Sequence, residues 1–109
     1  MEEFQYLAEL LKNELMITWD DDETTIRINR IIRNAVSSLD NKLGVKINYA
    51  ECSQEQELLI AYCVYLYNNI GNEFDINYQN DIMQLRAKYE VQQYELSKGD
   101  ENEEEDKNI

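Results

Sequence analysis

The 109-residue chain contains no proline and no histidine, and it has only three glycines and two cysteines. Because proline and glycine are the strongest breakers of regular structure, their scarcity disfavours a sheet with many tight turns and favours a few long helices. Cys52 and Cys63 form no close-paired metal motif, and no histidine is present to complete a zinc site. No apolar run approaches the roughly 20 residues that cross a bilayer. We therefore expect a cytosolic helical protein without a metal, a cofactor or a membrane partner.

Positive charge is also scarce, with 10 basic residues against 23 acidic ones and a net charge of −13. The residues from Ser97 onward hold six acids and two lysines, a net charge of −4, which leaves −9 on the rest of the chain. Such a surface repels a polyphosphate, since nucleic-acid binding draws on Lys and Arg side chains that neutralise phosphates. The composition therefore argues against direct binding of DNA or RNA.

Hydrophobic periodicity predicts four helices between residues 1 and 96, at about 3–16, 20–43, 53–70 and 74–96. The third is apolar nearly all round, which predicts that it is the central and most enclosed helix. The expected buried edge of the fourth consists of Phe74, Tyr78, Ile82, Leu85 and Tyr89. The predicted fold class is all-α, a small bundle of about four helices.

Capping residues mark the expected helix ends. Asp20, with Glu23 three positions on, suits the N-cap of the second helix, and Gly44 suits the left-handed residue that closes it. Ser53, with Gln56 three positions on, suits the N-cap of the third helix. Beyond Ser97 the chain has no periodicity and a high charge, so we expect a helical domain over residues 1–96 and a disordered acidic tail over 97–109.

Two groups of acidic residues raise the question of a metal site. The aspartates at 20–22 are consecutive and no glycine follows, whereas a calcium loop needs alternating oxygens and a glycine, so we interpret them as helix-capping and dipole-compensating residues. Glu51, Glu55 and Glu57 would need a second acidic pair on a facing helix to hold Mg²⁺ as a helical nucleotide hydrolase does. We interpret them as solvated acids and expect no catalytic residue.

Tyrosines at 62, 65, 67, 78 and 89 lie in the third and fourth predicted helices. A stacking platform for single-stranded nucleic acid would need interleaved Arg or Lys, and the third helix has none. Tyrosine buries a large area while its hydroxyl stays wet, so we expect these side chains in the core or at subunit contacts.

Arg27, Arg30 and Arg33 form the one basic stripe, on the side of the second helix opposite its apolar residues. They could be a solvated face with internal ion pairs worth a few tenths of a kcal/mol each. They could equally be a complementary patch for an acidic neighbour, which would set the register of a head-to-tail assembly. Both interpretations stay open, and the three arginines are the candidate subunit-interface residues.

Three stretches together carry a resemblance to a known family. Ile-Thr-Trp-Asp-Asp-Asp-Glu-Thr at 17–24, followed by an Ile-rich helix ending at Leu43-Gly44, resembles the opening of head–tail connector (adaptor, or head-completion) proteins of long-tailed bacteriophages. Residues 57–69 look like that family's "ELLL-Y-YARN" helix, and residues 72–85 look like its continuation. The resemblance covers roughly residues 3–90, and the glutamate-rich tail departs from the family pattern.

The resemblance implies a structural virion protein without catalysis. Copies would form a ring, twelvefold by family habit, beneath the portal protein, extend the DNA channel and dock a stopper or tail-joining protein. DNA would pass through without specific binding. The protein would be made in the bacterial host cytoplasm, would be monomeric or weakly associated alone, and would act at the head–tail interface.

Two other functions remain open from the sequence. One is an acidic helical regulator that occupies a host protein's nucleic-acid-binding site by charge mimicry. The other is the metal-dependent nucleotide hydrolase considered above.

Overall fold

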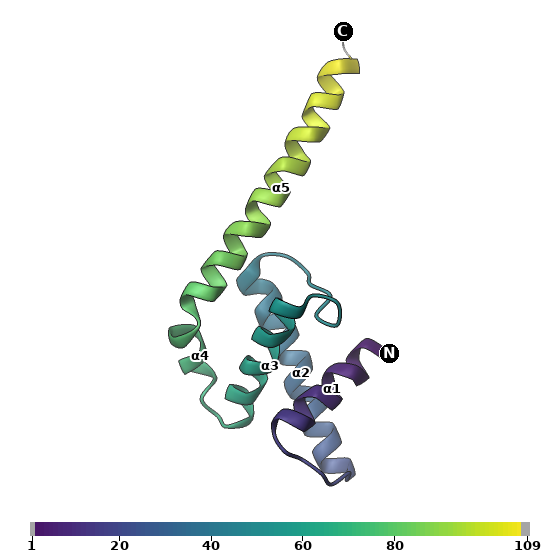
Figure 1. The fold of residues 1–109 in the computed structure, drawn as a ribbon, viewed down its shortest axis with the longest axis vertical. Helices are drawn as coiled ribbons and strands as arrows, with labels where there is room; N and C mark the ends of the chain where they lie inside the picture. Colours follow the sequence, from purple (N-terminus) through teal and green to yellow (C-terminus); the bar gives the residue numbers. More distant parts are fainter. Residues whose placement is uncertain (1, 108–109) are drawn as a thin grey trace.

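Over residues 2–107 the fold consists of five helices, α1 (Glu2–Glu14), α2 (Asp22–Leu43), α3 (Ser53–Tyr67), α4 (Gly71–Asn77) and α5 (Gln79–Lys107). The computed structural model describes the backbone of residues 2–107 and the side chains of residues 4–97, and that part of the chain contains no strand. The first four helices and the beginning of α5 form the body, and the rest of α5 extends away from it (Figure 1). The predicted all-α helical bundle is confirmed.

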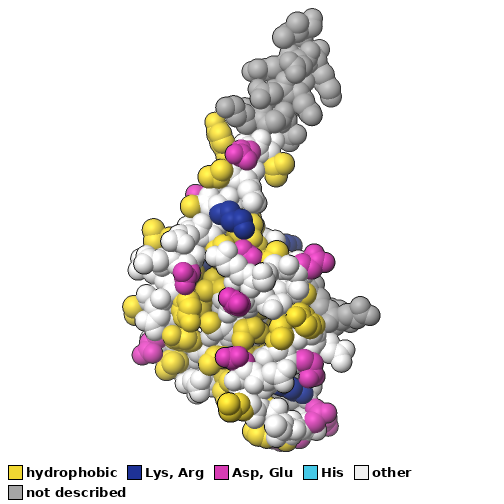
Figure 2. Space-filling model, in the orientation of Figure 1, with side chains coloured by type: hydrophobic (Ala, Val, Ile, Leu, Met, Phe, Trp, Pro, Cys, Tyr) yellow, Lys and Arg dark blue, Asp and Glu magenta, His cyan; other side chains and the backbone are white. Residues whose placement is uncertain are grey.

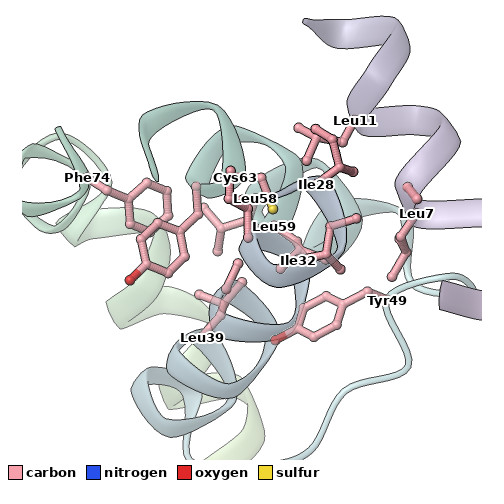
Figure 3. Close-up of a cluster of buried hydrophobic side chains, with 14 of the residues drawn as sticks. Leu7, Leu11, Ile28, Ile32, Leu39, Tyr49, Leu58, Leu59, Cys63 and Phe74 are labelled. Atoms are coloured by element: carbon pink, nitrogen blue, oxygen red, sulfur yellow. The ribbon is translucent and has the colours of Figure 1, made fainter. Parts of the chain in front are cut away.

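The core lies where α1, α2 and α3 meet, and α4 and α5 close one side of it. Leu7 and Leu11 of α1 enter the core from one side and Phe74 of α4 enters from the other (Figure 3). The buried residues of α2 are Ile28, Ile31, Ile32, Ala35, Leu39 and Leu43. Spacings of three and four residues put these side chains on one face, which is why α2 buries one side and exposes the other.

The second helix begins one residue later than expected. Asp21, and not Asp20, is the N-cap, and its side chain accepts a 2.7 Å hydrogen bond from the Thr24 backbone N–H. Asp20 instead lies 3.4 Å from the Lys12 ammonium of α1. At the other end Gly44 has φ +79°, and its N–H donates to the Asp40 carbonyl, which confirms the predicted left-handed closure.

The third helix differs from the prediction in its cap and in its burial. Its N-cap is Cys52, without a side-chain capping bond, so the proposed Ser53 cap is wrong. Gln56 does reach back, but its amide donates to the Tyr49 carbonyl at 3.0 Å. Only one face of α3 is fully buried, because α1 and α2 cover that face while several apolar residues opposite remain half-buried.

The predicted fourth helix is two helices, with a break at Tyr78. The break allows α4 to pack on α3 and α5 to pack on α2, which one straight helix would not achieve. The expected buried edge is confirmed: Phe74 and Leu85 are buried, and Tyr78, Ile82 and Tyr89 are half-buried against the core.

The last helix continues to Lys107, 11 residues beyond its predicted end at Leu96. Residues 97–107 contain no proline, and Glu and Lys are good helix formers, so local propensity allows the extension. The side chains from Lys98 onward, and residues 108–109 altogether, lie outside the described part. The predicted disorder of the 97–109 segment therefore stays a prediction.

Candidate assembly surfaces

Arg27, the first residue of the predicted basic stripe, is used within the fold. Its guanidinium donates a 3.1 Å hydrogen bond to the carbonyl oxygen of Tyr67, the last residue of α3, and lies 4.4 Å from the centroid of the Tyr67 ring. A cation at a helix C-terminus stabilises the exposed carbonyls there, and its stacking on tyrosine adds a cation–π contact. Arg27 thus ties the start of α2 to the end of α3.

Arg30 and Arg33 are different, because both are exposed and no acidic side chain among residues 4–97 forms an ion pair with either. Internal ion pairs, which belong to one of the two interpretations of this stripe, are therefore absent from the described residues. Ile26 is 58% exposed and lies on the same side of the helix, since Ile26, Arg30 and Arg33 follow at four- and three-residue intervals. We call these three residues the α2 outer face.

A second exposed face lies on α5. Met83, Val91 and Tyr94 are 59%, 55% and 65% exposed, and Ala87 is exposed between them. Their spacing of four, four and three residues keeps them on one side of the helix, opposite the side that buries Leu85. We call Met83, Ala87, Val91 and Tyr94 the α5 outer face. Figure 2 shows hydrophobic side chains on the part of α5 that stands clear of the body.

The tyrosines of α3 and α4 form an aromatic cluster around Phe74. The Tyr62 and Tyr78 rings both stack on the Phe74 ring, with centroids 4.4 and 4.7 Å from its centroid. The Tyr65 ring meets the Phe74 and Tyr78 rings edge-on, with a centroid distance of 5.8 Å in each case. The Tyr62 hydroxyl lies 2.9 Å from the Ser38 hydroxyl of α2. These residues hold α3, α4 and α2 together, so the expectation of a core role is confirmed for them.

Glu55 was expected to be solvated, and this is wrong. Its residue is 3% exposed, and its Oε1 atom has no hydrogen-bond partner among the described residues. The Lys88 ammonium of α5 lies 3.7 Å from that oxygen and is the cation that faces it. Glu55 lies one turn before Leu59, so its place on the buried face of α3 could have been found from the helical spacing. The ion pair links α3 to α5 at one end of the core.

Tyr89 lies beside this ion pair. Burial and the neighbouring Glu55 carboxylate raise the pKa of the Tyr89 phenol from 10.0 to about 12. Tyr49, whose hydroxyl donates a 2.8 Å hydrogen bond to Asp40, also has a raised pKa, because burial and that carboxylate disfavour its phenolate. The phenols in this part of the protein are therefore held in their neutral form.

We expect alkaline pH to destabilise the protein through these phenols. A phenol with a folded pKa above its unfolded value contributes stability that is full below pH 10 and is lost as the pH rises toward 12. Urea unfolding measured from neutral pH to pH 12 should show this fall, and Tyr89→Phe should make it shallower. Tyr94→Phe is the matched control, because Tyr94 is 65% exposed and should leave the slope unchanged. An equal slope for wild type and Tyr89→Phe would contradict the assignment.

The remaining acidic residues form no metal-binding group of three or more within the described residues. Hydrogen bonds from the Thr24 hydroxyl and backbone lower the pKa of Asp21, as expected of a capping carboxylate. Glu57 of α3 and Asp81 of α5 line one shallow hollow with Ala61 and Tyr78. Neither carboxylate there is accompanied by a nucleophile–base arrangement that would define a reaction.

Comparison with known proteins adds no relative. No protein-family model, curated protein or solved structure matches the chain. Within the described residues, no helix is both long enough and apolar enough to span a bilayer.

Proposed function

We propose that this protein is a head–tail connector subunit of a long-tailed bacteriophage. It assembles as a ring beneath the portal protein, extends the DNA channel and docks a stopper or tail-joining protein. It is a structural virion protein without a catalytic role, and it works at the head–tail interface after synthesis in the host cytoplasm. DNA passes through the ring without specific binding.

The observation that carries the proposal is a pair of different exposed faces on one small body. The α2 outer face combines Ile26 with two arginines, and the α5 outer face is apolar. Two unlike faces on one body differ from a single self-complementary face, which pairs with its own copy across a two-fold axis. They favour a heterologous contact, in which each copy uses one face toward each neighbour, and a closed series of such contacts is a ring.

The local structure of the family-like stretches supports the same proposal. In the 17–24 stretch Ile17 is buried, Asp21 caps α2, and the Trp19 indole N–H donates to the Thr24 hydroxyl at 3.0 Å. Residues 57–69 cover most of α3 and its end, and residues 72–85 form α4 and the start of α5. The residues of these stretches therefore act in core packing and helix capping, and such structural roles are what we expect of a connector motif.

The surface charge suits a protein that DNA must pass. The body facing the viewer in Figure 2 carries scattered acidic side chains and few basic ones. An acidic wall disfavours adhesion of the duplex, because binding of DNA depends on basic residues that release counterions.

The test is assembly on the portal protein encoded in the same genome. We expect the isolated protein to be monomeric or weakly associated, to co-purify with tagged portal rings, and to add a layer of density below the portal in electron micrographs. The gene should lie between capsid and tail genes. A stable compact dimer with no affinity for the portal would overturn the proposal. Competition with DNA for a host protein would indicate charge mimicry, and Mg²⁺-dependent pyrophosphate release would indicate a hydrolase.

A further inference from the structure

The α2 outer face is the basic exception on an acidic chain. Arg30 and Arg33 project without an acidic partner among residues 4–97, although the chain has 23 acidic residues. Exposed arginines on such a protein attract any acidic segment that can reach them, and Ile26 beside them offers apolar area. This combination suits a partner that is both apolar and acidic.

The end of the chain has this composition. Val91 and Tyr94 are exposed on α5, and the sequence then continues into a segment, residues 97–109, with a net charge of −4. Apolar side chains followed by carboxylates are the complement of Ile26 followed by Arg30 and Arg33.

Within the described residues, the end of α5 does not lie against the α2 outer face of the same chain (Figure 1). Arg30 lies in the first half of α2 and Arg33 near its middle, while the C-terminal end of α2 is held next to α4 by the 2.7 Å Lys42–Asp75 ion pair. About 12 residues of helix, or roughly 18 Å, separate Arg30 from Lys42. From that end α5 leads away from the start of α2, as Figure 1 shows. A second copy can present the end of its α5 to these arginines without its chain having to turn back toward the start of its own α2.

We infer that the α2 outer face of one copy binds the end of α5 and the acidic 97–109 segment of a second copy. The contact is heterologous, so each subunit offers its acidic end to one neighbour and its arginines to the other. The inference rests on the proposed ring, and it identifies which surfaces form the ring contact. Because the pairing is ionic at exposed positions, it weakens as salt is added.

Two full-length charge-reversal variants test the contact. One carries Arg30→Glu with Arg33→Glu, and the other carries Glu103→Lys with Glu104→Lys. In sedimentation velocity at low salt, the wild type should associate with rising concentration, and each variant alone should associate at least roughly tenfold more weakly. In the first variant two carboxylates replace the arginines and meet the acidic segment, and in the second the net charge of residues 97–109 changes from −4 to 0, so that the arginines lose their attraction. An equimolar mixture of the two variants should recover part of the association, since the arginines of the second variant then find the acidic segment of the first. Circular dichroism should show both variants folded.

Lys46→Glu is the control for overall charge, because Lys46 is exposed on the α2–α3 connection and its reversal changes the net charge as much as Arg30→Glu does. Equal effects of Lys46→Glu and Arg30→Glu would overturn the inference. It would also be overturned by a mixture that associates no more than its components, which is the result expected if the acidic segment folds back on its own arginines.

Portal binding separates this inference from the proposed function. If the protein binds the portal and forms complete rings whatever the charge at positions 30 and 33, the connector function stands and the contact is wrong. If the variants exchange partners as expected but the wild type ignores the portal, the contact stands and the connector function is wrong.

Discussion

Phe74→Ala is expected to lower the free energy of unfolding by about 4 kcal/mol, within the range for removing a buried aromatic side chain. Phe74 is fully buried and touches Tyr62, Tyr65 and Tyr78. A domain of this size is stable by only several kcal/mol, so the variant should be near the limit of folding. Urea unfolding followed by circular dichroism measures the change.

Ile76→Ala is the matched control, because it lies two residues away on the same short helix and is 74% exposed. Its effect should be within about 0.5 kcal/mol. Phe74 is the one buried residue of α4, so its loss should also detach that helix and speed amide exchange over residues 71–77. A loss below about 1 kcal/mol for Phe74→Ala would show that the aromatic cluster does not hold α4 in place.

Lys88→Met is expected to destabilise the protein by about 2 kcal/mol at neutral pH. The substitution keeps much of the apolar stem but leaves the Glu55 carboxylate, 4% exposed, without its cation. Breaking a fully buried pair costs about 3–5 kcal/mol, and the lower figure applies here because the Lys88 side chain is 49% exposed and therefore partly screened.

A double variant distinguishes lost charge pairing from lost packing. Glu55→Gln combined with Lys88→Met removes both charges, so it should recover most of the stability that Lys88→Met loses. Lys46→Met, at an exposed lysine, should change the stability little. If Lys88→Met and the double variant are equally destabilised, the Lys88 stem and not its charge makes the contribution.

The local signals in the sequence were reliable where one helix decides the outcome. The apolar stripe of α2, the left-handed Gly44 and the buried edge from Phe74 to Tyr89 are all consequences of helical spacing and backbone sterics. The cap of α2 was misplaced by one residue because three consecutive aspartates are equally good caps, and only the path from α1 selects Asp21.

The candidate surface was predicted only in part. The helical spacing of the sequence predicts that the three arginines share one side of α2. It does not show that Arg27 binds Tyr67, 40 residues away, while Arg30 and Arg33 stay exposed without an acidic partner in the described residues. The spacing of Met83, Ala87, Val91 and Tyr94 also indicates the α5 outer face, but the sequence analysis does not predict it, because the buried edge from Phe74 to Tyr89 accounts for the apolar residues on the other side.

By itself, the sequence determined the helical class, the acidic composition and the inner face of α2 and of the segment from Phe74 to Tyr89, because these depend on composition and on spacing within a segment. Only the tertiary structure decided which residues of different helices contact one another, and how those contacts alter the helix boundaries and the burial expected from each segment alone. It split the fourth helix at Tyr78 so that α4 packs on α3 and α5 on α2. It also buried Glu55 against Lys88, and it separated the one tethered arginine from the two that remain for a partner. Such pairings join residues far apart along the chain, and no local periodicity specifies them.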